Sequence, residues 1–200
     1  MNTFTAKTFT IPTLKGLSAK TIEEHLKLYQ GYVNNSNNLI NKLSELRQNQ
    51  EANAYIIGEL SRRLSFEYNG MRNHEVYFAS LSGGTTAPKL DNPLEKAVAE
   101  TWGSFETWLA AFKSMAATTR GIGWAVLWYD RENKKLLTTW VDEQHLGLLQ
   151  DCTMILGLDM WEHSYVADYQ PSGKKNYIED FFANLNWSVI EERFREAAGL

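Results

Sequence analysis

Cysteine and long hydrophobic runs are scarce in this chain of 200 residues, and each scarcity excludes a class of protein. The single cysteine, Cys152, rules out a disulfide within the chain and suits a reducing compartment. No apolar run approaches the length of a membrane span, and the N-terminal segment lacks the apolar stretch of a secretory signal. We therefore expect a cytoplasmic protein with no membrane partner.

An excess of positive charge is also missing, since the formal net charge is -4 at pH 7. A chain of this charge is not expected to have nucleic acid or an anionic membrane as its main partner. Its length is sufficient to bury a sizeable core without disulfides. The 7 tryptophans, 9 tyrosines and 9 phenylalanines could wall a shielded site, although such residues are more often simply core.

The first half of the sequence has the hydrophobic period of two long helices. Apolar residues recur at steps of three and four from about residue 18 to 47, and again from about 53 to 81. Ser18 is a candidate N-cap for the first helix, whereas the polar patch at 34–38 could bend or interrupt it. Two consecutive long helices predict an antiparallel hairpin.

A segment rich in glycine and threonine, 82–88, separates this hairpin from a half of mixed character. The patterns predict helices at about 92–101, 104–118, 174–184 and 187–197, and strands at 123–128, 135–141 and 153–158. The expected fold class is α+β: an N-terminal long α-helical hairpin followed by an α/β domain with a small three-stranded antiparallel sheet. We expect two domains, 1–84 and 85–200.

The segment 159–163 places the carboxylate of Asp159 four residues before the imidazole of His163, a spacing that puts both on one face of a helical turn. His25 and His74 lie on the apolar stripes of the two long helices. A lone histidine on such a stripe is more often a hydrogen-bonded core residue than a ligand. Two such histidines beside the Asp159–His163 pair favour a site of three imidazoles and one carboxylate, which suits iron or manganese, with zinc chemically possible.

Five segments resemble the iron/manganese superoxide dismutase family in order and spacing over nearly the whole chain. They are 159–165 (D-x-W-E-H-A-Y in the family), Asn73-His74 with Tyr77-Phe78, 21–25 followed by 32–35, 121–124 (G-S-G-W in the family), and 182–187. The first is specific, whereas the glycine–tryptophan segment alone would be weak. The resemblance implies that His25, His74, Asp159 and His163 bind one iron or manganese ion, with solvent as fifth ligand. It also implies that superoxide is disproportionated into dioxygen and hydrogen peroxide.

The resemblance implies roles for residues around the metal as well. Tyr32, seven residues after His25, is expected to be the gateway tyrosine, although the family has its tyrosine one residue further along. The alternative for Tyr32 is plain packing. Tyr29 stands where many members have another histidine, so the usual proton-relay partner is in doubt.

Many members hydrogen-bond the bound solvent with a glutamine, which iron forms often supply four residues before the second ligand. This chain has Gly70 at that position, so the donor must come from the other half. Of the two candidates there, His145 is favoured and Gln144 follows closely; the alternative for His145 is a solvent-exposed loop histidine. Gly70 alone does not decide between iron and manganese.

Four further residues have expected roles. Trp124 and Trp161 are expected to wall the site and exclude bulk water. Glu162 in the family reaches across a dimer interface to the partner's ligand histidine, so it implies a homodimer or a tetramer; a surface glutamate is the alternative. Lys174 lies in the loop where the family places a cation beside the substrate funnel, and either steers the superoxide anion or is a solvated loop lysine.

Two other functions stay open at this stage. Non-haem iron oxygenases usually bind iron through two histidines and one carboxylate, and four protein ligands leave too little room for their cosubstrates. A dismutase-like protein that binds iron or manganese with little or no turnover is the stronger alternative. It is supported by three departures from the family, at Gly70, Tyr29 and Val166. In the family, a tyrosine is usual near the position of Val166.

Overall fold

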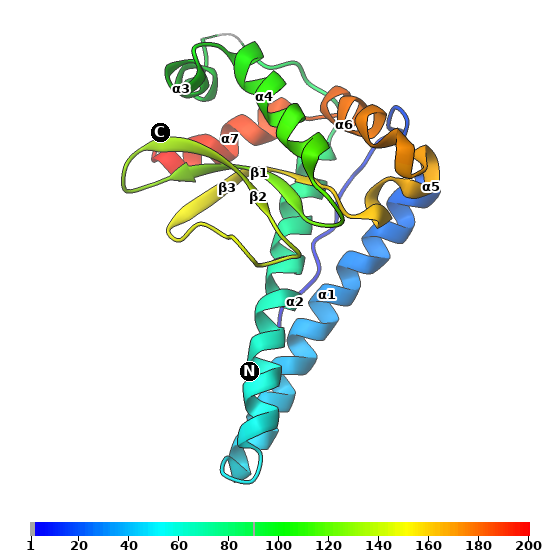
Figure 1. Ribbon diagram of the computed structural model, residues 1–200, viewed down its shortest axis with the longest axis vertical. Coiled ribbons are helices and arrows are strands. Elements are labelled where there is room, and N and C mark those ends of the chain that lie inside the picture. The colour runs from blue at the N-terminus through cyan, green and yellow to red at the C-terminus, as the bar shows by residue number, and fades with distance from the viewer. Residues whose placement is uncertain (1–2, 90) are drawn as a thin grey trace.

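Two helices of 28 residues each form the N-terminal half of the chain in a computed structural model, which describes residues 3–89 and 91–200. Helices α1 (Ala19–Leu46) and α2 (Ala54–Leu81), joined through the short 3₁₀ helix η1 (Arg47–Asn49), form an antiparallel hairpin whose tip projects away from the sheet (Figure 1). The Ser18 hydroxyl caps α1 by accepting a hydrogen bond from the backbone N–H of Thr21 at 3.2 Å. The predicted hairpin is therefore confirmed.

The polar patch at 34–38 does not interrupt α1, contrary to one of the two expectations for it. Its amides find partners outside the backbone of α1. Asn37 exchanges two hydrogen bonds with the backbone of Phe4 in the N-terminal arm, at 2.8 and 2.9 Å. Asn35 donates to the carboxylate of Glu67 on α2 at 3.3 Å. Because these side chains bond elsewhere, they do not compete for the backbone groups of the helix.

The second half combines short helices with one sheet. In chain order it contains α3 (Pro93–Trp102), α4 (Phe105–Thr118), β1 (Trp124–Asp130), β2 (Lys135–Val141), β3 (Cys152–Asp159), η2 (Glu162–Ser164), α5 (Val166–Tyr169), η3 (Pro171–Gly173), α6 (Lys174–Ala183) and α7 (Trp187–Ala198). The strands are antiparallel in the order β2-β1-β3, which confirms the predicted fold class. The proposed division at residues 84 and 85 stays a prediction.

The sheet meets the hairpin at the end of β3. Helices α2 and α7 pack against β3, and α4 packs against β1. Six of the seven residues of the central strand β1 are buried, as its almost continuous apolar sequence requires. One cluster of buried side chains includes residues from both halves of the chain. Asp159 therefore ends its strand inside this core, beside the two long helices. No helix within the described residues is long and apolar enough to cross a bilayer.

Candidate metal centre

Four side chains from four segments converge on one point. His25 comes from α1, His74 from α2, Asp159 from the end of β3 and His163 from η2. Their ligand atoms all lie within 4.8 Å of one another. Asp159 Oδ2 lies 3.1 Å from Nε2 of His25 and of His163, and 3.5 Å from Nε2 of His74. The fold thus brings together the four residues that the sequence indicated as ligands.

The centre is almost closed to solvent. The side chains of His25, His74 and Asp159 are 0% exposed, and that of His163 is 23% exposed. Three polar side chains without solvent contact must satisfy their hydrogen-bonding groups inside the protein. Of the four residues, only His163 has a partly exposed side chain.

In the described chain, the hydrogen bonds of His74 engage one ring nitrogen and leave the other unsatisfied. His74 Nδ1 donates to the carbonyl of Gly70 at 2.6 Å, which leaves the lone pair on Nε2. This Nε2 is buried and has no hydrogen-bond partner within the described residues. A buried acceptor without a partner is costly, and a cation bound by the three imidazoles and Asp159 would satisfy it. This mixed nitrogen and oxygen set fits iron or manganese.

The protonation states also suit a metal. Burial, and then the proximity of His25, lowers the pKa of His74 to about 3. Burial lowers the pKa of His25 too, although the bond to Asp159 opposes the shift. Burial acts to raise the pKa of Asp159, but the neighbouring His163 and His25 outweigh it and keep this pKa below its usual range. At neutral pH the centre therefore presents two neutral imidazoles and an ionised carboxylate, the forms in which these groups bind metal.

Asp159 is held in place by hydrogen bonds to its side chain and to its backbone carbonyl. Its Oδ1 accepts from the backbone N–H of Trp161 at 2.8 Å. Its backbone carbonyl accepts from the hydroxyl of Tyr177 at 2.8 Å and from that of Ser164 at 3.0 Å. Such outer contacts orient a ligand. Tyr177 was not predicted, because nothing local in the sequence signals that its hydroxyl reaches the backbone at the end of β3.

Gln144 and Tyr32 lie together beside the centre. Gln144 Nε2 donates to the Tyr32 hydroxyl at 3.0 Å, and Gln144 Oε1 accepts from Trp124 Nε1 at 2.9 Å. Asn73 Nδ2 donates to the Gln144 carbonyl at 3.0 Å. The ring of Tyr32 lies 5.0 Å from that of His74, centroid to centroid. Gln144 is 0% exposed, and it is fixed beside Tyr32 by two hydrogen bonds on its side-chain amide and one on its backbone carbonyl.

His145 does not take part in this set of hydrogen bonds, although the sequence analysis favoured it over Gln144. Its ring packs edge-on against Phe66 at 5.7 Å, and its Nδ1 lies 3.8 Å from the carboxylate of Glu143. The backbone φ of Glu143 is 49°, a left-handed conformation that redirects the chain just before these two residues. As a result Gln144, and not His145, faces Tyr32.

Gly70 has a packing role that the sequence did not reveal. A Cβ atom at this position would lie 2.5 Å from Cδ1 and 2.6 Å from Cε1 of Tyr32. Real side chains do not approach so closely, and both residues are buried. The absence of a side chain at Gly70 therefore allows the ring of Tyr32 to lie against α2, near His74.

We expect Gly70→Ala to lower the free energy of unfolding by about 1–3 kcal/mol, because the new methyl group overpacks the Tyr32 ring. Gly58→Ala is the matched control, since it lies on the same helix and a Cβ there would meet nothing within 4 Å. The control should gain about 0.5–1 kcal/mol from helix propensity. Urea unfolding of both variants tests this. Equal stabilisation of the two would contradict the account of Gly70.

Of the remaining predicted residues, the two tryptophans lie beside the ligands. Trp124 is fully buried, with its ring 5.1 Å from that of His74, and the partly buried Trp161 has its ring 5.7 Å from that of His163. Glu162 is exposed next to His163. Lys174 lies at the start of α6, where its Nζ donates to the carbonyl of Thr119 at 2.5 Å.

Tyr29 lies elsewhere. Its hydroxyl accepts from the backbone N–H of Lys7 at 2.8 Å and donates to the carboxylate of Glu75 at 3.3 Å. These bonds connect Tyr29 to the N-terminal arm and α2. In the described part of the chain, Tyr29 has no hydrogen bond to Tyr32 or Gln144, and therefore no direct path for a proton to either residue.

Comparison with known proteins gives matches to both halves of the chain. The family model for the alpha-hairpin domain of iron/manganese superoxide dismutases matches residues 14–82, and that for their C-terminal domain matches residues 90–193. An iron superoxide dismutase of Tetrahymena pyriformis is 33% identical, over 86% of this chain and 89% of that protein. An iron enzyme of Pyrobaculum aerophilum is 30% identical, over 96% and 95%. A manganese enzyme of Mycobacterium leprae is 33% identical, over 86% and 82%, so overall similarity does not distinguish the two metals.

Proposed function

We infer that this chain, which belongs to the iron/manganese superoxide dismutase family, is a superoxide dismutase that depends on iron or manganese. The observation that carries this conclusion is the convergence of His25, His74, Asp159 and His163 on one buried point. One three-histidine, one-aspartate site fits one ion per chain. An iron or manganese ion held by these four residues would supply a change of valence by one electron, the chemistry that converts two superoxide ions and two protons into dioxygen and hydrogen peroxide.

We propose that Gln144 and Tyr32 position the reacting species in the centre by donating hydrogen bonds, and that the Tyr32 hydroxyl also passes protons to them. The Gln144 amide has two N–H groups, of which one goes to Tyr32 and the other can donate into the centre. The Tyr32 hydroxyl accepts from Gln144, so its own proton is available to donate. Burial raises the pKa of Tyr32, which keeps that proton on the oxygen at neutral pH. The two side chains thus supply directed donors next to His74.

We expect Gln144→Leu to lower superoxide turnover per bound metal roughly 100-fold, since leucine keeps a similar shape but removes the buried hydrogen-bond donor. His145→Leu, one residue further along, should stay within about twofold of the wild type, because its ring packs outside the hydrogen-bonded set. Pulse radiolysis or stopped-flow decay of superoxide measures both. The reverse order of effects would return the donor role to His145.

A metal-binding protein with little turnover is the second candidate, and the position of Tyr29 supports it. Tyr29 bonds to Lys7 and Glu75 and contributes no relay group beside Tyr32. Dioxygen and hydrogen peroxide formed per bound metal separate the two candidates. Both products in the ratio of one to one, with many turnovers per metal, support the dismutase. Stoichiometric metal with less than one turnover would favour the second candidate.

We propose that the chain forms a homodimer, or a tetramer built from such dimers, through the surface around Glu162. Glu162 is exposed and directly precedes the partly exposed ligand His163. His163 Nε2 faces Asp159, which leaves Nδ1 for an outer partner. A carboxylate from a second copy of the chain would orient this imidazole, as outer-shell acceptors commonly do for ligand histidines.

We expect Glu162→Ala to raise the dimer dissociation constant by at least about 30-fold, because each loss of a charged partner at an interface costs about 2 kcal/mol or more. Glu132→Ala, at the exposed turn between β1 and β2, is the control and should not change the constant. Sedimentation velocity over a range of concentrations gives the result. A wild type that stays monomeric would overturn the proposal.

We further propose that Lys174 attracts the superoxide anion. Its ammonium group bonds to the carbonyl of Thr119 and takes part in no ion pair within residues 3–89 and 91–200. Its positive charge is therefore not neutralised locally, and in a chain of net charge -4 such a charge can raise the local concentration of an anion.

A further inference from the structure

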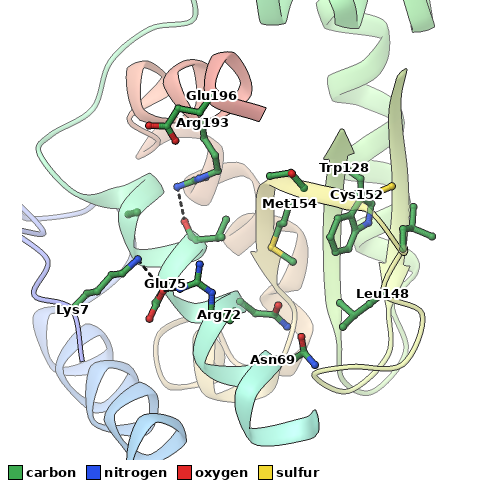
Figure 2. A pocket seen from close by; sticks show the side chains of 15 residues that line it. Lys7, Asn69, Arg72, Glu75, Trp128, Leu148, Cys152, Met154, Arg193 and Glu196 are labelled. Carbon is green, nitrogen blue, oxygen red and sulfur yellow. Dashed lines mark hydrogen bonds and ion pairs between the residues drawn. The ribbon is translucent and has the colours of Figure 1, made fainter. Parts of the chain in front are cut away.

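A cavity of about 510 Å³ lies between the N-terminal arm, α2, β3 and α7, and the dismutase reaction does not use it (Figure 2). None of the four metal ligands lines it. Its size is in the range of small-molecule sites. Arg72 and Asn73, which line it, directly precede His74 on α2, so the cavity adjoins the outer side of the segment that carries a metal ligand.

Positive charge predominates among the side chains that line this cavity. The three cations are Lys7, Arg72 and Arg193, and the two carboxylates are Glu75 and Glu196, which leaves one net positive charge. Glu75 pairs with Lys7 at 3.0 Å and also with Arg72, so one buried carboxylate serves two cations. A singly charged anion would bring the cavity to neutrality.

Arg193 is the cation without a carboxylate partner. Its guanidinium donates to the carbonyl of Ile155 at 2.7 Å and to the hydroxyl of Ser80 at 3.2 Å, and reaches the carbonyl of Val76 at 3.5 Å. It forms no ion pair within the described residues. Burial lowers the pKa of Arg193 to about 10, so it stays charged at neutral pH. A partly buried cation with neutral partners only is incompletely compensated, and its remaining N–H groups can bind an anion.

The opposite wall of the cavity is apolar. Figure 2 shows Trp128, Leu148 and Met154 across from Arg193 and Arg72. Trp128 and Met154 belong to β1 and β3, and Leu148 lies in the loop that connects β2 to β3. One charged wall and one apolar wall select a ligand with a charged group at one end and a hydrocarbon body.

We propose that this cavity binds a small organic monocarboxylate, whose charged group pairs with Arg193 and whose apolar body contacts Trp128, Leu148 and Met154. A guanidinium matches a carboxylate in two parallel hydrogen bonds. A single charge on the ligand equals the single net charge of the lining residues. The site is separate from superoxide turnover, so the proposal stands independently of the proposed function.

Cys152 provides a direct test, because the only cysteine of the chain lines this cavity. The rate at which an aromatic disulfide reagent modifies Cys152 is measured on the metal-loaded protein, with 4-phenylbutyrate or the uncharged 4-phenylbutan-1-ol added. We expect 4-phenylbutyrate to slow the reaction saturably, with a dissociation constant of about 1 mM or lower, and the alcohol to have at least about tenfold weaker effect. Equal protection by both compounds, or none by either, overturns the proposal.

Variants then test the assignment to Arg193. We expect Arg193→Gln to weaken protection by 4-phenylbutyrate at least about tenfold, as the loss of a charged hydrogen bond requires. Arg195→Gln, on the same helix but outside the cavity, is the matched control. If Arg193→Gln fails to fold, Arg72→Gln removes a second cation from the lining and should weaken protection too. Unchanged protection in every folded cavity variant would contradict the proposed site.

Discussion

Asp159→Ala is expected to lose its metal and to lower superoxide turnover per chain by more than about 100-fold. Asp159 supplies the only negative charge among the four ligands, and its Oδ2 lies within 3.5 Å of all three Nε2 atoms. Loss of an outer-shell partner alone lowers metal affinity 10- to 100-fold, so loss of the charged ligand itself should exceed that range. Without Asp159, three imidazoles would hold a cation in a buried site with no compensating charge.

The measurement for this variant is metal content per chain together with superoxide decay. Glu132→Ala is again the control, since it removes an exposed carboxylate far from the ligands in sequence. Circular dichroism distinguishes loss of metal from loss of the fold. A folded Asp159→Ala protein with full metal content and normal turnover would show that the reaction does not depend on this centre.

The metal-free protein should lose stability as the pH falls from about 6.5 towards 3. The pKa of His74 is lowered to about 3 by burial and by His25, whereas the unfolded chain has the ordinary value of 6.5. Between these values the unfolded state binds a proton that the folded state does not. Stability is therefore fully present above pH 6.5 and falls by about 1.4 kcal/mol per pH unit, to a total of roughly 5 kcal/mol. The lowered pKa of His25 acts in the same direction.

Urea unfolding of the metal-free protein at several pH values between 7.5 and 4.5 tests this prediction. Other groups titrate in the same range, so the informative quantity is the difference in unfolding free energy between wild type and His74→Leu. The wild-type unfolding free energy minus that of His74→Leu should fall as the pH falls. For Gly58→Ala on the same helix, which removes no ionisable group, the corresponding difference should change little. A constant difference for His74→Leu would mean that His74 is not held neutral by its surroundings.

The sequence predicted the elements and the ligands because both depend on local patterns. His25 and His74 lie on apolar stripes with helical spacing, and Asp159 and His163 belong to one specific segment. The structure brings these four residues together as expected. The cytoplasmic location and the domain division remain predictions.

What the sequence could not supply depends on contacts between distant segments. The hydrogen bond of Gln144, and not His145, to Tyr32 goes with the left-handed backbone at Glu143. The role of Gly70 follows from its contact with Tyr32, 38 positions earlier in the chain. Asn37, inside the uninterrupted helix α1, bonds to the N-terminal arm 33 positions earlier in the chain. None of these features leaves a pattern in a single segment.

The central claim is that these four ligands hold a redox-active iron or manganese ion. The most direct test is metal analysis of the purified protein alongside superoxide decay, for wild type and His163→Ala. We expect about one iron or manganese ion per chain in the wild type, as the single site requires, and loss of activity in the variant. A protein that holds only zinc, or no metal, or one in which His163→Ala keeps full activity, would contradict it.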